Sequence, residues 1–343
     1  MKKSFKTSLI AFALTSVLAA CSQTTDTSTV TMAAATSQFI EVTDANFAHA
    51  ETARNYRNWV ALGANKQITH MRNLPPRGKD APTVQMNDDT LYSVVIAEAE
   101  NGHIKFSIPK TDVYLAVQVV TEGGHGQQYV VGEGDYDLPV ETDFAFLIYR
   151  TGVEKGIEAA RAAQDKISDD TFKFNTYSVQ NYNYDEVEEW VSKLTAETQG
   201  AVFTYTFPRT SDGITDRHQW NLENANGWGG SSPEVNVANL YSNSVMLDGS
   251  KCLSTTFEDP ESKYFTSITP YDSARYLMPG VKHVSSNTWT VNSDKTVTVS
   301  FNCGADAVNN IDTKGLDFSF TMRYYGVSQK VIDGKINPEK TVK

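Results

Sequence analysis

The sequence predicts a mainly β fold of the α+β class, built from two antiparallel β domains with a few peripheral helices. Short runs rich in Val, Ile, Tyr and Phe recur along the chain and are separated by Asn-Gly, Pro and Gly turn signals. The length of 343 residues is enough for two domains of ordinary size, each able to bury a core. We expect the first domain at residues 38–199 and the second at residues 200–343.

The first domain is expected to combine a β region with three helices. Asp44 is suited to cap a helix running to about Asn65, because apolar side chains there share one broad stripe. Later helices are predicted at 154–167, which is rich in alanine, and at 185–195, which opens with a capping-box pattern. The expected strands of this domain are 90–100, 103–109, 113–120 and 144–150.

The second domain is expected to begin after a long irregular connection. Residues 200–233 are rich in Gly, Asn, Asp and Trp, a composition typical of loops. The strands expected after this connection are 241–247, 251–258, 287–291, 296–303 and 318–326.

The two halves share a pattern of residues. A Tyr-Ser pair opens an expected strand in each half, and a glycine turn, a proline and an aromatic residue follow it. These residues are Tyr92, Ser93, Gly102, Pro109 and Tyr114 in the first half and Tyr241, Ser242, Gly249, Pro260 and Phe265 in the second. Either a β unit was duplicated, or two antiparallel domains use similar turn chemistry independently.

The chain begins with a secretory leader. Lys2, Lys3 and Lys6 precede an apolar run at 9–20, which has the length of a signal-peptide core and is too short to span a bilayer as a stable helix. The closing sequence LAAC, which ends at Cys21, resembles the cleavage region of bacterial lipoproteins. In those proteins the cysteine becomes the lipid-bearing first residue of the mature chain.

This resemblance implies an address at the cell envelope. Residues 1–20 are then a signal peptide, Cys21 carries several acyl chains such as palmitate, and residues 22–37 form a flexible Ser/Thr/Ala-rich tether. Ser22 implies sorting to the outer membrane, with the folded body facing the periplasm or the cell surface.

The charge of the chain limits its partners. There are 41 Asp and Glu against 30 Lys and Arg, and the formal net charge is −11. An acidic surface repels phosphate backbones and anionic lipid head groups, so we expect no nucleic acid partner and a membrane contact made through the lipid anchor. No segment after the leader offers the ~20 apolar residues of a transmembrane helix.

Two cysteines remain after Cys21, an even number in an oxidising compartment. A disulfide between Cys252 and Cys303 is therefore one interpretation. Strand alternation argues against it, because Cys303 shares a face with Phe301 whereas Cys252 does not share the face of Leu253. Two separate buried thiols are the alternative.

Several motifs are shared with a known pair of families. They are 87–93 (NDDTLYS), Pro109 with 114–120, and 147–151 in the first half, and 226–230 (NGWGG), 241–242, 247–249 and 264–272 in the second. On these residues, most of 40–325 resembles domain of unknown function 1254 followed by domain of unknown function 1214. The resemblance implies two β-sandwich or jelly-roll domains and no settled activity.

The candidate site residues are polar and aromatic groups near turns. Asn87, Asp88 and Asp89 could ligate calcium or hold sugar hydroxyls, or they could simply cap their own backbone at a turn. His125, between glycines after a strand, is a candidate ligand or general base, although most loop histidines are only solvated. Trp228 is suited either to stack on a sugar ring or to cover the contact between the domains.

These observations favour a binding or structural lipoprotein over an enzyme. The expected ligand is a small molecule or glycan in a cleft near the domain boundary, and the binding residues would be Asn87, Asp89, Tyr92, His125 and Trp228. The alternative is a hydrolase or lyase acting on a polysaccharide or other polar substrate, with His125 as base and Asp88 or Asp89 as acid or cation ligand. The common hydrolase, metalloprotease, nucleotide and redox motifs are absent from the sequence. No cofactor is expected, with calcium at 87–89 left open.

Overall fold

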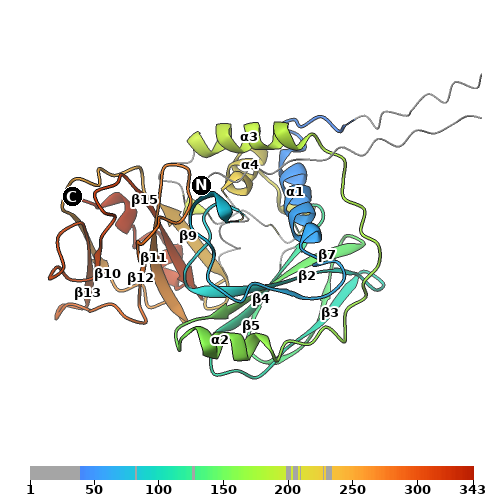
Figure 1. The fold of residues 1–343 in the computed structure, drawn as a ribbon, viewed down its shortest axis with the longest axis horizontal. Helices are drawn as coiled ribbons and strands as arrows, with labels where there is room; N and C mark the ends of the chain where they lie inside the picture. The colour runs from blue at the N-terminus through green and yellow to red at the C-terminus, as the bar shows by residue number, and fades with distance from the viewer. Residues whose placement is uncertain are drawn as a thin grey trace, which may run out of the picture. The chain divides into compact units, whose positions relative to one another are not determined.

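Two five-stranded antiparallel sheets, one from each half of the chain, form the centre of the fold (Figure 1). The computed structural model describes residues 39–343 except 82, 126–127, 198–201, 204–207, 209, 227 and 229–233. The lipidation site and tether expected at 21–37 lie outside the described residues. Residues Gln38–Lys343 form one unit.

The first sheet has the strand order β1-β2-β7-β4-β5, and a separate pair, β3-β6, packs on it. The strands are β1 Thr69–His70, β2 Thr90–Glu98, β3 His103–Ile108, β4 Leu115–Thr121, β5 Gln128–Val131, β6 Gly134–Pro139 and β7 Phe144–Gly152. Val95, Val117 and Leu147 on one face of the sheet pack against Ile104 and Phe106 of β3 in a core cluster. The sequence thus forms a β-sandwich here, because alternation directs alternate side chains to the same face.

The second sheet has the order β12-β11-β15-β9-β8, and a smaller sheet, β10-β13-β14, packs on it. The strands are β8 Val202–Phe203, β9 Asn239–Asn243, β10 Leu253–Glu258, β11 Phe265–Tyr271, β12 Val284–Ser285, β13 Thr296–Phe301, β14 Asn310–Ile311 and β15 Ser319–Tyr325. Phe257, Val299 and Phe301 of the smaller sheet meet Phe320 and Met322 of β15 in a second core. The predicted mainly β fold of sandwich-like layers is confirmed.

Helix α1 (Phe47–Ala61) packs on the remaining face of the first sheet. The helices are α1 Phe47–Ala61, α2 Ile157–Gln164, α3 Tyr184–Glu197, α4 Arg217–Ala225 and α5 Gln329–Ile332, with 3₁₀ turns η1 Gly78–Asp80, η2 Ser211–Gly213 and η3 Pro338–Lys340. Helices α1, α3 and α4 contact one another, and Figure 1 shows them grouped on one side of the first sheet. Tyr56 and Trp59 of α1 pack on Phe146 of β7. None of the helices in the described ranges is long and apolar enough to cross a bilayer.

Two expectations about local structure are wrong. The stretch 200–233 is not wholly irregular, because α4 forms within it: Asp216 caps this helix by accepting a hydrogen bond from the Gln219 backbone N–H at 3.0 Å. The segment 287–291 is not a strand, since only Val291 makes an isolated bridge, to Val297. Loop-like composition hid α4, and a short run of Thr, Trp and Val imitated a strand at 287–291.

The duplicated pattern is matched by the topology. Strands β2, β7 and β4 stand in the same relative order as β9, β15 and β11. Tyr92 pairs in register with Arg150, and Tyr241 pairs in register with Arg323. The two halves therefore repeat both a strand arrangement and a cross-strand Tyr–Arg pair, which supports duplication over independent turn chemistry.

Candidate functional site

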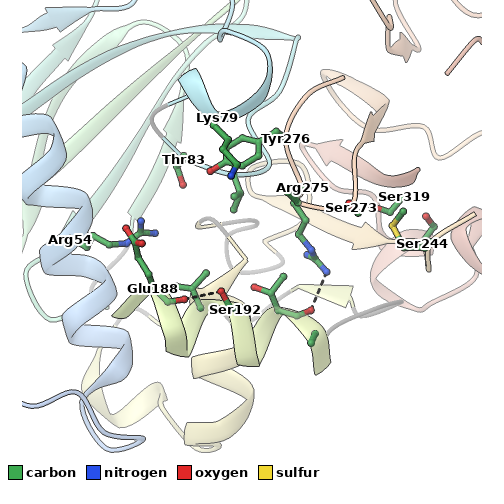
Figure 2. Close-up of a pocket in the computed structure, with 16 residues that line it drawn as sticks. Arg54, Lys79, Thr83, Glu188, Ser192, Ser244, Ser273, Arg275, Tyr276 and Ser319 are labelled. Atoms are coloured by element: carbon green, nitrogen blue, oxygen red, sulfur yellow. Dashed lines mark hydrogen bonds between the residues drawn. The ribbon is translucent and has the colours of Figure 1, made fainter. Parts of the chain in front are cut away.

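An open cleft of about 680 Å³ lies beside α3, and most of the residues that line it have polar side chains (Figure 2). The labelled side chains in Figure 2 are Arg54, Lys79, Thr83, Glu188, Ser192, Ser244, Ser273, Arg275, Tyr276 and Ser319. Volumes of this size are typical of small-molecule sites. We call this feature the outer cleft.

The outer cleft has fixed charges on two sides. Arg54 of α1 forms an ion pair with Glu51 at 2.6 Å, and this neighbour holds the pKa of Arg54 above its ordinary value. Arg275 reaches towards α3, where its guanidinium donates to the Thr195 carbonyl at 3.4 Å (Figure 2). Burial lowers the pKa of Arg275 to about 10, so it remains charged at neutral pH.

A second, small cavity of about 60 Å³ shares Thr83 and Val84 with the outer cleft. We call it the inner cavity. Its lining includes the polar and aromatic side chains of Trp59, Asn87, Tyr92, Arg150, Trp228, Tyr241 and Arg323. The first sheet, the second sheet and α1 all contribute to this lining, so both halves of the chain are needed to complete it.

Arg150 enters the inner cavity from β7. Phe146, Ile148 and Arg150 share one face of β7 by alternation, so the guanidinium lies on an apolar face that α1 covers. Its Nη2 donates to Gln118 Oε1 at 2.7 Å, and its Nη1 donates to the Tyr92 hydroxyl at 3.3 Å. The guanidinium also lies 5.4 Å from the centre of the Tyr92 ring.

Arg323 occupies the equivalent place on β15. Its Nη2 donates to the Gln85 carbonyl at 2.6 Å and to the Tyr271 hydroxyl. The guanidinium lies 5.1 Å from the centre of the Tyr241 ring. Arg323 and its partners thereby hold the 85–87 segment of the first half against the second sheet, and Tyr271 Oη adds a hydrogen bond to the Met86 carbonyl at 2.7 Å.

The Asn87–Asp89 cluster is mainly a structural turn. Asn87 Oδ1 accepts from the backbone N–H groups of Asp89 and Thr90, both at 2.9 Å, and Asn87 Nδ2 donates to Tyr92 Oη at 2.7 Å. This is the backbone-capping role that was the alternative to ligand binding. Asn87 nevertheless remains part of the inner-cavity lining.

The two aspartates bind groups of the protein itself. Asp88 pairs with Arg77 at 2.8 Å. Asp89 accepts a hydrogen bond from Ser267 Oγ at 2.5 Å and lies 3.1 Å from His283 Nε2. Ser267 and His283 belong to the second half, so these contacts join the two halves.

The Asp89–His283 pair shifts the pKa of both groups. Burial by itself raises the pKa of Asp89, but His283 and the Ser267 hydroxyl outweigh it and bring the pKa below its ordinary value. Burial by itself lowers the pKa of His283, but Asp89 and then Asp88 raise it above its ordinary value. Both shifts favour the charged pair.

His125 is not brought together with Asp88 or Asp89. The carbonyl of His125 is bound by the Thr121 N–H at the end of β4, which pairs with Ala145 at the start of β7. The carbonyl of Asp89 is bound by Val153, just past the other end of β7. These positions are about 26 Å apart along the strand, so the catalytic pairing of His125 with these aspartates has no geometric support. His125 instead lies 2.9 Å from Glu141.

Trp228 is an interior residue. Trp228 is buried and packs edge-on against Phe146, in a cluster that also contains Tyr271 of the second sheet. It therefore covers the contact between the halves, which was the alternative to stacking on an exposed sugar. Across the described residues, no group of three or more His, Cys, Asp or Glu is arranged to hold a metal ion.

Comparison with known proteins gives a family match but no activity. Residues 65–169 match the family model described as "Protein of unknown function (DUF1254)". The structure is similar to that of the VPA0106 protein from Vibrio parahaemolyticus, with a TM-score of 0.58 and 14% identity, covering 88% of this chain and 97% of that one. A putative uncharacterized protein from Burkholderia cenocepacia has a TM-score of 0.49 and 14% identity, with 88% of each chain covered. No curated protein matches the chain.

The likeness to the Vibrio parahaemolyticus protein supports the fold alone. The family match covers β2, β4 and β7 and includes Tyr92 and Arg150. It ends before the second sheet, so Tyr241 and Arg323 lie outside it. The pairing with a second family that the sequence motifs suggested remains a prediction.

Sequence reasoning singled out Asn87, Tyr92 and Trp228, which the structure places together in the inner-cavity lining. It missed Arg150 and Arg323. The sequence did offer a sign of both arginines. Arg150 belongs to the mostly apolar strand sequence FAFLIYR, and Arg323 belongs to the strand sequence FTMRYY. An arginine inside a strand that is buried on both faces needs a partner or a ligand.

Proposed function

We propose that this chain is an envelope lipoprotein whose folded body binds a small polar molecule or glycan at the outer cleft and the inner cavity. The anchor rests on the leader sequence that ends at Cys21. The binding role rests on the structure of the two adjoining spaces. No described feature favours a particular reaction, so binding is the function that the geometry supports best.

One observation carries the binding role: the outer cleft adjoins an inner cavity that has buried cationic side chains. The outer cleft is large enough for a small ligand and offers serine hydroxyls and both signs of charge. The inner cavity joins it at Thr83 and Val84 and presents Arg150 and Arg323. A large polar cleft next to a small cationic cavity is suited to a molecule with a polar body and one distinct end group.

The test is a ligand screen on the full chain, purified in detergent, with sugars, small acids and metal ions. Binding stabilises the folded state by mass action, by about 2.7 kcal/mol at a ligand concentration of 100 Kd. A ligand is expected to raise the unfolding midpoint measured by calorimetry. A panel in which no compound raises the midpoint would contradict the proposal.

Two matched substitutions locate the binding. Ser192→Trp fills the outer cleft from the exposed face of α3 and should abolish the shift given by a ligand. Ser293→Trp places the same side chain at an exposed turn outside the cleft and should leave the shift unchanged. A ligand whose shift survives in Ser192→Trp binds elsewhere, and this result would refute the assignment of the cleft.

A further inference from the structure

Arg150 and Arg323 are both buried beside the inner cavity, with 6% and 1% of their surfaces exposed. Neither has a carboxylate within ion-pair distance among the residues that the structure describes. Arg150 is bound by an amide oxygen and a hydroxyl, and Arg323 by a backbone carbonyl and a hydroxyl. Guanidinium groups stay charged in proteins, so two positive charges are held in the interior by neutral acceptors.

Both guanidiniums retain unused hydrogen-bond donors. Arg150 Nε and Arg323 Nη1 are buried and have no hydrogen-bond partner. Buried polar groups are nearly always satisfied, and an unsatisfied charged donor is among the most costly to bury. The unpaired donors therefore point to a missing acceptor that carries negative charge.

The charged groups around Arg150 and Arg323 indicate how much negative charge a ligand would have to supply. Ser267 pairs in register with Arg323 and donates to Asp89, and Asp89 and Arg323 influence each other's pKa. Asp89 is itself paired with His283, so it cancels little of the charge on Arg323. Among the residues that the structure describes, no carboxylate is paired with Arg150, whose register partner on β4 is Ala116. Both positive charges are therefore left largely to an anionic ligand, and the size of the cavity decides between a carboxylate and a larger oxyanion.

The size of the inner cavity and the symmetry of its two Tyr–Arg pairs further restrict the anionic group that fits there. The inner cavity, at about 60 Å³, has room for roughly two water molecules. A carboxylate has two equivalent oxygens, and the two Tyr–Arg pairs come from equivalent positions of two similar sheets. The fork of an arginine matches a carboxylate in plane and spacing.

We propose that the inner cavity binds the carboxylate end of a small organic monoacid, between Arg150 and Arg323, while the rest of the ligand extends past Thr83 and Val84 into the outer cleft. This inference deepens the proposed binding function and rests on it. It names the chemical class of the ligand, an organic carboxylate, and the residues that recognise it.

The first test uses acetate and its neutral isostere acetamide as probes of the full chain. Trp59 and Trp228 line the inner cavity, so their fluorescence reports on its occupation. Sodium acetate should change the fluorescence in a saturable way and raise the unfolding midpoint, measured against sodium chloride of equal ionic strength. Acetamide should do neither. An equal response to acetamide, or no saturable response to acetate, would overturn the inference.

Sulfate distinguishes the carboxylate from other anions. Sulfate is tetrahedral and larger than a planar carboxylate, so in a cavity of about 60 Å³ we expect it to bind at least tenfold more weakly than acetate. Sulfate that binds as tightly as acetate would overturn the assignment of a monoanionic carboxylate.

Substitutions test the two residues. Arg150→Met and Arg323→Met keep an unbranched side chain without charge, and each should weaken acetate binding at least tenfold. Arg72→Gln removes a half-buried arginine that pairs with Asp165 and lines neither cavity, so it should leave acetate binding unchanged. Unchanged acetate binding in both methionine variants would refute the site. If either methionine variant does not fold, the comparison of acetate with acetamide in the unaltered chain still decides the inference.

The two proposals fail in different ways. If neutral compounds in the screen give shifts that Ser192→Trp abolishes, while acetate gives none, the binding function stands and the carboxylate inference falls. If no compound binds, including acetate, both fall.

Discussion

Removing the disulfide between Cys252 and Cys303 should destabilise the protein by about 4 kcal/mol. The two cysteines are bonded in the structure and lie 51 residues apart in sequence. In the chain-entropy model, cross-linking a loop of this length removes about 14 cal/mol/K from the unfolded chain, which is about 4 kcal/mol at 25 °C.

The position of the disulfide allows the expected loss of stability to be measured. Cys252 is exposed and Cys303 is half-buried, so replacing them by alanine removes little packing. The bond lies just beyond the β10–β13 ladder, whose last register pair is Leu253 with Phe301. The folded strands hold the two ends together with or without the bond, and the main effect is therefore on the unfolded chain.

The assay is urea unfolding of the Cys252→Ala/Cys303→Ala double variant and of the unaltered chain, with and without reductant. The double variant and the reduced unaltered chain should show the same loss in the free energy of unfolding. Their thermal midpoint should fall by about 8 °C for a protein of this size. Reductant should have no effect on the double variant, which serves as the control. A loss below about 1 kcal/mol would refute the chain-entropy argument.

Four further changes test other parts of the structure. Cys21→Ala should release the protein from membranes into the soluble fraction, and continued sedimentation with membranes would contradict the lipid anchor. Asn87→Ala should cost about 2 kcal/mol in urea unfolding, because two backbone N–H groups lose their buried acceptor; a cost near zero would show that water replaces the cap. Gly249→Ala should cost about 1–3 kcal/mol, because a Cβ there would overlap the Leu316 carbonyl oxygen, and an unchanged urea midpoint would refute this packing. His283→Gln should cost most between about pH 4 and pH 6.5, where Asp89 and His283 are both charged, and progressively less as the pH rises through the raised pKa of His283; a pH-independent cost would show that the pair contributes nothing through charge.

Much of the fold follows from local sequence patterns. Strands β2, β4 and β7 lie where runs of Val, Ile and Phe predicted them, because buried strands of this kind have few alternatives. Helix α4 was missed because its capping residue, Asp216, stands in a stretch whose composition is typical of loops. The alternation of side chains along the strand could not show whether Cys252 and Cys303 are bonded. The backbone of Asn302 is left-handed, with φ 57°, so the alternation ends before Cys303.

The candidate site was only partly accessible from the sequence. Asn87 and Tyr92 stand five residues apart in one motif, so local reasoning could find them together. Arg150 and Arg323 are 173 positions apart in the chain, and only the packing of two sheets brings them to one cavity. His125 drew attention as a histidine among glycines, yet the strand register places it at the far end of β7 from the aspartates.

Because both halves of the chain line the inner cavity, fragments of this chain must be chosen with care. The region that matches a described family, 65–169, supplies Arg150 and the 85–89 segment but neither Tyr241 nor Arg323. A protein that carried this region alone would have only part of the lining of the inner cavity, and Arg150 would lack the residues that face it from the second sheet. Fragments cut at the family boundary should therefore be poor material for ligand screening, and the smallest useful piece must include β15.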